Sequence, residues 1–214
     1  MAVPRKKSQR NAEQTKERIL ASAMAEFAAK GFDGARLDAI VKKAKVNINL
    51  VYHYFGSKEG LFLAVMEAAY QTMRAHHGEI EIKGKDPVEA MSSLVRRTFR
   101  IFADFPEIIG LLNSENLYQA KHIAKSPHIR ELYNPLLSTI GEVLDRGVAA
   151  GVFRPGVDPK ELFISINGEG YFYLSNRYTL GFILDENLLD EARMARREEH
   201  IVEVILSYLR YRPE

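Results

Sequence analysis

The chain has 214 residues, and its 46% hydrophobic and 27% charged content is ordinary for a globular protein with one good core and a small appended domain. It contains no cysteine, which excludes disulfides and thiolate metal sites and fits a reducing compartment. No secretory leader opens the sequence and no apolar run approaches the ~20 residues of a membrane span. We therefore expect a cytoplasmic protein without membrane contact.

The net charge of +2 conceals an asymmetry along the chain. Residues 1–58 hold 12 Lys and Arg against 5 Asp and Glu, whereas residues 59–214 hold 18 against 23. The N-terminal part is therefore the part expected to bind a polyanion. Its first basic residues, at 5–10, are open to two interpretations: a solvated tail, or an arm that lies along phosphates or in a minor groove.

The spacing of apolar residues predicts helices from the start of the chain. A first amphipathic helix is expected at about 11–30 and should stop at Gly31. Two short helices follow, because apolar residues recur at helical spacing over 37–44 and again over 51–55, with a break at 45–47. Ser57 is expected to cap a fourth helix, near whose end His76 and His77 are interpreted as surface residues.

The rest of the chain also reads as helical. Asp86-Pro87 and Asp158-Pro159 each combine an N-cap with Pro at the first helical position. Pro135 should bend the helix that ends at Gly151, and a last helix is expected at about 187–211. Strand alternation is not found over any useful length, so the fold class is all-α.

Residues 35–61 carry the strongest functional signal. Two short helices joined by a tight turn are the layout that places one helix in the major groove of DNA. The second short helix leaves an outer face of short or planar polar groups that suit base edges and phosphates. These residues are Asn47, Ile48, Asn49, Tyr52 and His53.

This segment resembles the DNA-binding domain of the tetracycline-repressor (TetR) family of bacterial regulators. The resemblance is carried by Phe27, Gly31-Phe32, Ile40-Val41, Ala44 to Asn47, Tyr52 to Phe55 and Ser57 to Leu61. Ala35 to Leu37 and Asn49-Leu50 look most like the pyrimidine-utilisation repressor branch. The chain departs from the family at three places: Ala35-Arg36 replaces a small hydroxyl residue, Lys45 replaces Gly, and Asn47 replaces Ser. Asn47 should cap its helix as well as Ser would, whereas Lys45 stands where a positive φ is preferred.

The resemblance implies two domains and a set of DNA contacts. Residues 1–57 would form the helix-turn-helix domain with a basic arm, and residues 58–214 a helical domain for ligand binding and dimerisation. Tyr52 and Lys58 match phosphate-binding positions, although Lys58 could also be an ordinary solvated lysine. Candidate base contacts are Asn47, Asn49 and His53, with Ile48 on a thymine methyl and Arg36 on phosphate or guanine.

A homodimer is expected through the last two helices. Residues 162–184 are apolar on more than one face, and the last helix carries an apolar stripe opposite Arg193, Arg196 and Arg197. Members of the resembling family pair such helices in a four-helix bundle, and a twofold dimer would read a palindromic operator in double-stranded DNA. The alternative is that residues 162–184 form the buried central helix of a larger core.

The family also implies an unknown small-molecule effector bound in the C-terminal helices. A few polar residues interrupt apolar helices there, as an orienting ligand pocket requires, and the same residues could instead make structural hydrogen bonds. The candidates for ligand contact are Asn113, Asn116, His122, Glu169, Tyr173 and Asn176. The expected function is a repressor that an effector releases from DNA.

Two other classes of function have weaker support in the sequence. An enzyme would need a nucleophile elbow, a Gly-rich phosphate loop or a metal motif, and the sequence has none of these. Gly168-Glu169-Gly170 is too short for a dinucleotide fingerprint, and no H-x-x-x-H pair occurs. We therefore expect no catalytic residue, no metal and no cofactor. A sequence-tolerant architectural DNA binder would need basic residues over the whole chain, whereas the C-terminal two-thirds is acidic.

Overall fold

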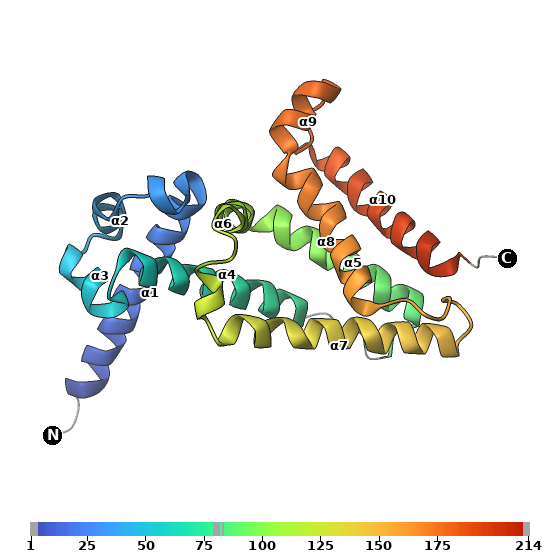
Figure 1. The fold of residues 1–214 in the computed structure, drawn as a ribbon, viewed down its shortest axis with the longest axis horizontal. Coiled ribbons are helices and arrows are strands. Elements are labelled where there is room, and N and C mark those ends of the chain that lie inside the picture. Colours follow the sequence, from blue (N-terminus) through green and yellow to red (C-terminus); the bar gives the residue numbers. More distant parts are fainter. Residues whose placement is uncertain (1–3, 79–81, 83, 212–214) are drawn as a thin grey trace. The chain divides into compact units, whose positions relative to one another are not determined.

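The computed structural model describes residues 4–78, 82 and 84–211 (Figure 1). Over these residues the prediction of an all-α fold is confirmed, since every element is helical. The elements are α1 Pro4–Gly34, α2 Leu37–Ala44, α3 Ile48–Phe55, α4 Lys58–Gly78, α5 Pro87–Asp104, α6 Pro106–Leu117, the 3-10 turn η1 Ile123–Lys125, α7 His128–Ala149, α8 Pro159–Ser175, α9 Arg177–Leu184 and α10 Glu191–Arg210. None of the helices described is both long and apolar enough to cross a bilayer.

Two compact units divide the chain. The first unit comprises Met1–Tyr70 with Glu107–Ile129, and the second comprises Gln71–Pro106 with Arg130–Glu214. Packing therefore assigns the beginning of α4, most of α6 and η1 to the unit that holds α1, α2 and α3. The expected boundary at residue 57 concerns binding functions, which packing does not test, and it stays a prediction.

The core of the first unit follows the apolar spacing of the sequence. Ile19, Phe27, Ile40, Val51 and Phe62 are fully buried, and they join α1 to α2, α3 and α4. The predicted stop of the first helix lies at the right residue, because Gly31 has φ 68° and ψ −178°, a conformation that L side chains rarely adopt. Helical geometry resumes beyond Gly31, so the structure has a kink there and α1 ends at Gly34.

A buried polar pair lies beside this kink. His122 and Glu115 are almost fully buried, and the imidazole Nδ1 lies 2.7 Å from Glu115 Oε2. The other carboxylate oxygen of Glu115 accepts the backbone N–H groups of His122 and Ile123, at 2.8 and 3.0 Å. Phe32 and Phe62 pack on the imidazole, with ring centroids 4.6 and 4.9 Å away. Both oxygens of the Glu115 carboxylate are thus engaged by groups of the same chain.

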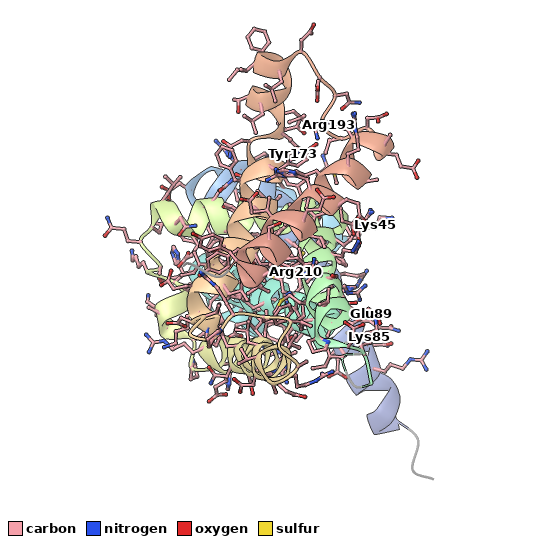
Figure 2. The ribbon with its side chains drawn as sticks, turned by 90° about the vertical axis from the view of Figure 1, so that its right-hand side faces the viewer. Lys45, Lys85, Glu89, Tyr173, Arg193 and Arg210 are labelled. Carbon is pink, nitrogen blue, oxygen red and sulfur yellow. The ribbon has the colours of Figure 1, made fainter. Side chains whose placement is uncertain are left out.

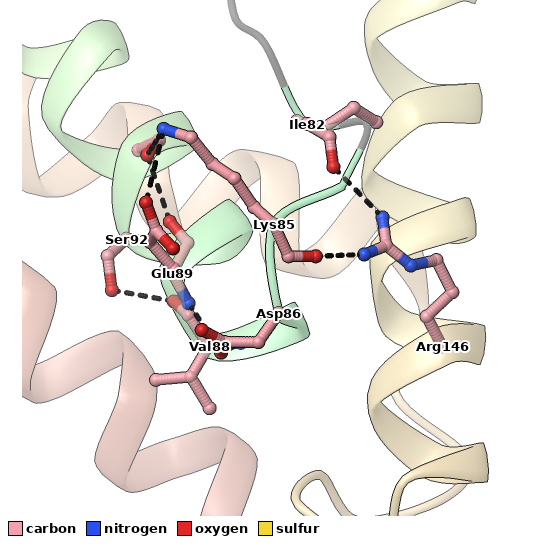
Figure 3. A network of polar contacts seen from close by, with 8 residues as sticks. Ile82, Lys85, Asp86, Val88, Glu89, Ser92 and Arg146 are labelled. Carbon is pink, nitrogen blue, oxygen red and sulfur yellow. Dashed lines mark hydrogen bonds and ion pairs between the residues drawn. The ribbon is translucent and has the colours of Figure 1, made fainter.

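The second unit is built around α5, whose apolar face packs against α8 and α10. Both predicted N-caps are confirmed: Asp86 accepts from the N–H groups of Val88 and Glu89, and Asp158 accepts from that of Lys160. Figure 3 shows the Asp86 cap together with Arg146 of α7, whose guanidinium donates to the carbonyls of Ile82 and Lys85. The segment before α5 is therefore held from two sides.

Two expectations for the second unit were wrong. The apolar segment 162–184 is not one helix, because helical geometry breaks at Asn176 between α8 and α9. His76 and His77 are not surface residues. Both are half-buried, His77 Nε2 lies 3.3 Å from Thr98 Oγ1, and Arg97 donates to the His76 carbonyl at 2.9 Å. Burial lowers the pKa of His77 from 6.5 to about 4, and the nearby charge of Arg97 adds to this effect.

His122→Ala should destabilise the protein by about 3 kcal/mol, because it leaves Glu115 buried without its side-chain partner and opens a space between aromatic rings. Urea unfolding at neutral pH measures this change. His128→Ala is the matched control, since that side chain is exposed, and it should change stability by less than about 0.5 kcal/mol. Equal stabilities for the two variants would contradict a structural role for His122.

His77 should make folding stability depend on pH. The unfolded chain takes up a proton as the pH falls below 6.5, whereas the folded chain resists protonation until about pH 4. Stability that is present above pH 6.5 is therefore lost as the pH falls toward 4, by at most about 3 kcal/mol. Denaturant midpoints of His77→Gln should lose this part of the pH dependence. His200→Gln, at an exposed position, should keep it, and identical profiles for wild type and His77→Gln would refute the assignment.

Candidate nucleic-acid interface

Helix α3 presents the predicted contact residues on one face. Val51 is fully buried at the centre of the helix, so the side chains at the opposite positions face outward. Asn49, Tyr52 and His53 are exposed and Ile48 is half-buried. The face that the sequence predicted is therefore accessible in the folded chain.

The turn before α3 has the geometry expected from its residues. Asn47 caps α3, with its side-chain oxygen accepting from the N–H of Asn49 at 2.8 Å. Lys45 has φ 54° and ψ 49°, the left-handed conformation predicted for this position, and its N–H bonds to the carbonyls that end α2. Because the side-chain oxygen of Asn47 is used in the cap, its NH₂ group is the part that remains able to donate to a base.

The start of α2 is held by a contact with α1. Arg36 is the N-cap residue, and its backbone N–H donates to the Glu26 carboxylate at 3.3 Å while its side chain is exposed. Lys30 bonds the same oxygen of Glu26 at 2.8 Å, and this hydrogen bond is the main cause of the lowered pKa of Glu26. Arg36 is thus fixed through its backbone and free to extend its guanidinium.

The side chain of Lys58 is only partly exposed to solvent and contacts the end of α1. Its ammonium donates to the carbonyl of Asp33 at 3.3 Å and lies 5.0 Å from the centre of the Phe32 ring. The side chain is half-buried at the first position of α4. A phosphate bound here would meet an ammonium that the kinked end of α1 already positions.

A groove between the middle of α1 and α3 was not predicted from the sequence. A groove of about 490 Å³ is lined by Ala12, Glu13 and Lys16 of α1 with Tyr54 of α3. Lys16 is exposed, and its ammonium lies 5.9 Å from the centre of the Phe55 ring. Two features of the sequence could have indicated this groove. Lys16 lies one turn before the buried Ile19, and the end of α3 is aromatic.

The six candidate ligand residues fall into two sets. Asn113 and Asn116 are exposed on α6, and they share the first unit with the buried His122. Glu169, Tyr173 and Asn176 belong to the second unit, where each makes a contact within the chain. Glu169 pairs with Arg197, the Tyr173 hydroxyl donates to the Leu188 carbonyl at 2.8 Å, and the Asn176 amide donates to the Phe172 carbonyl at 2.9 Å.

A groove of about 360 Å³ between α8 and α10 contains one of these candidates. It is lined by Ser165, Gly168, Glu169, Val204, Ile205 and Tyr208. Glu169 is its only ionisable carboxylate among these lining residues, and the carboxylate is engaged by Arg197. The groove offers an apolar surface with one ion pair at its edge.

Comparison with known proteins identifies the family. Residues 19–65 match the sequence profile of the bacterial regulatory proteins of the tetR family, and residues 87–205 match the tetracyclin repressor-like C-terminal domain. The HTH-type transcriptional repressor NicS of Pseudomonas putida is 33% identical over 199 residues, which cover 93% of this chain and 94% of that protein. The HTH-type transcriptional regulator RutR of Escherichia coli O157:H7 is 26% identical over 203 residues, which cover 92% of this chain and 91% of that protein.

Solved structures agree in fold. A tetR-family regulatory protein from Rhodococcus RHA1 superimposes with a TM-score of 0.73 at 18% identity, covering 93% of this chain and 98% of that one. The solved structure shares the fold of this chain. The profile matches span both the short helices around α3 and the helices of the second unit, and they identify the family. The chain is a member of the TetR family of DNA-binding transcriptional regulators, and it is not an enzyme.

Proposed function

We propose that two copies of this protein bind a palindromic operator, with α3 of each copy in the major groove of one half-site. The observation that carries the proposal is the exposed face of Asn49, Tyr52 and His53 on a helix fixed from behind by Val51. A rigid helix can hold its side chains in register with base edges. A mobile helix would lose part of the binding free energy in becoming ordered.

The contacts divide into two kinds. Asn47, Asn49 and His53 read base edges, and Ile48 contacts a thymine methyl. Tyr52 and Lys58 bind the backbone, where their contribution is independent of sequence, and Arg36 binds phosphate or a guanine. The surplus of positive charge in residues 1–58, 12 basic against 5 acidic, supports this assignment because phosphate contacts dominate affinity.

The second copy binds through the C-terminal helices, as the apolar residues of 162–184 and 187–211 suggested. Support comes from side chains that remain exposed there, among them Phe172 on α8 and Tyr208 on α10. Such a dimer would set the separation of the two α3 helices, which a palindrome requires.

We further propose that the protein is a cytoplasmic repressor which a small molecule releases from DNA. The name of NicS as a repressor, at 33% identity over nearly the whole chain, supports repression over activation. In this scheme residues 1–57 bind DNA and residues 58–214 bind the effector and the second copy. The effector would shift the separation of the α3 helices, with a coupling free energy of about 1 to 3 kcal/mol.

Asn49→Ala should cost about 1 to 3 kcal/mol in binding to the preferred operator and little on scrambled DNA, because only base contacts distinguish sequences. Lys58→Ala should weaken binding to both and lower the slope of log K against log salt by about one. Fluorescence anisotropy with both duplexes over a salt series measures these effects. Lys85→Ala removes the same charge outside the proposed interface and serves as the control. Equal losses on both duplexes for Asn49→Ala would show that this residue does not read bases.

An effector should be detectable by screening metabolites for a rise in unfolding temperature, since ligand at 100 times its Kd stabilises the folded state by about 2.7 kcal/mol. Each hit is then tested for release of operator DNA. Asn116→Ala and Glu169→Gln are expected to abolish that release while operator affinity stays within twofold of wild type. If both variants still release DNA at the wild-type effector concentration, these residues are not ligand contacts.

A further inference from the structure

The carboxylate of Asp33 lies near the ammonium of Lys58 but is not paired with it. The Lys58 ammonium donates to the backbone carbonyl of Asp33 at 3.3 Å, which brings it within reach of the short Asp33 side chain. Both side chains are described by the structure, and they form no ion pair. Two opposite charges so close together normally attract each other, so another group must hold the carboxylate.

The hydroxyl of Tyr118 is that group. Tyr118 directly follows α6, and its hydroxyl donates a hydrogen bond to the Asp33 carboxylate, which raises the pKa of the Tyr118 phenol. The Tyr118 ring packs on Phe32 and on His122, with ring centroids 5.6 and 5.1 Å apart. These contacts keep the phenol at the end of α1, where it engages the carboxylate.

Helix α6 is itself closely packed against the end of α1. The Ser114 hydroxyl accepts the backbone N–H of Phe32 at 3.1 Å. A side chain at Gly110 would place its Cβ only 2.3 Å from the Ala28 carbonyl oxygen, so the two backbones lie as close as glycine permits. Close packing of this kind leaves little room for movement, and Tyr118 is therefore presented to Asp33 by a rigid neighbour.

A second carboxylate close to Lys58 in the sequence is also engaged from this part of the chain. The Glu59 carboxylate pairs with the ammonium of Lys125, the last residue of η1, at 2.5 Å. This hydrogen bond is the main cause of the lowered pKa of Glu59. Residues 118–125 thus occupy both acidic side chains, and a phosphate that approaches Lys58 meets an ammonium without a competing carboxylate.

Carboxylates elsewhere in the chain do pair with a nearby lysine. The Glu89 carboxylate lies 3.5 Å from the ammonium of Lys85, and both residues are labelled in Figure 2. An Asp33 carboxylate released from Tyr118 is expected to pair with Lys58 in the same way. Its negative charge would then offset the attraction of Lys58 for a phosphate and would repel the phosphate itself.

We propose that Tyr118 is a positioning residue for DNA binding, which keeps the Asp33 carboxylate away from Lys58 and so leaves that ammonium to the phosphate backbone. The inference rests on the proposed phosphate contact of Lys58 and names the residue that makes this contact available. Tyr118 lies outside residues 1–57, so the segment after α6 contributes to DNA affinity by acting on a residue that binds DNA.

Tyr118→Phe tests this role, because it removes the hydroxyl and keeps the ring. Fluorescence anisotropy is measured with a palindromic operator selected from random duplexes and with its scrambled sequence. The Kd should rise about threefold to tenfold on both duplexes, and the slope of log K against log salt should fall by up to about one, since a backbone contact is weakened. Tyr211→Phe, at an exposed position in the other unit, is the matched control and should change neither quantity.

A rescue variant separates this role from a merely structural one. Tyr118→Phe/Asp33→Asn has no carboxylate to pair with Lys58, so its affinity and salt slope should recover, whereas lost packing could not be restored in this way. Asp33→Asn alone gives the baseline, because removal of any negative charge near DNA raises affinity somewhat. Its gain in affinity should be larger in the Tyr118→Phe background than in the wild type. Equal gains in the two backgrounds, or wild-type binding by Tyr118→Phe, overturn the proposal.

A third comparison tests whether Tyr118 acts through Lys58. In the Lys58→Ala background Tyr118→Phe should cause no further loss of affinity, because the ammonium that it positions is absent. A loss as large as in the wild-type background would show that Tyr118 affects DNA binding by another route, and it would also overturn the proposal.

These outcomes are distinct from failure of the proposed function. A wild-type protein that prefers its operator, a weakened Lys58→Ala and an unchanged Tyr118→Phe together remove only the role of Tyr118. A wild-type protein that binds no duplex removes both proposals.

Discussion

The burial of Val51 determines what α3 can present to a ligand. A helix of eight residues is too short to be stable alone, so its orientation comes from the core formed by Ile40, Phe27 and Phe62. Once Val51 enters this core, helical geometry fixes which side chains point away from it. The Asn47 cap and the left-handed Lys45 then fix where the helix begins. The exposed polar face of α3 is therefore a consequence of packing behind it.

Much of the fold in both units could be predicted from sequence where its signals are local. Asn47, Asp86 and Asp158 act as caps within three residues, and such short-range hydrogen bonds depend little on the rest of the fold. Gly31 interrupts α1 where the sequence predicted the helix to stop, and Lys45 has the positive φ that the resemblance implied. The apolar spacing of α1 to α4 identified the buried side chains for the same reason.

The features that were missed depend on residues far apart in sequence. His77 is half-buried because Thr98 and Arg97 of α5 lie against it, and nothing near residue 77 indicates this. Lys58 donates to the carbonyl of Asp33, 25 positions earlier. The sequence also did not indicate that Glu115 and the rings of Phe32 and Phe62 enclose His122. Such environments arise only when helices pack, so a single sequence contains no direct signal for them.

Helix α9 is closed by hydrogen bonds of its own and occupies eight consecutive residues. Changes on its outer surface therefore leave α3 and the core behind it untouched. If α9 belongs to the dimer interface proposed for residues 162–184, a bacterium with several related regulators could keep them from forming mixed pairs by varying this short segment alone. The proteins encoded by duplicated genes could then form separate dimers before their operator sequences diverge.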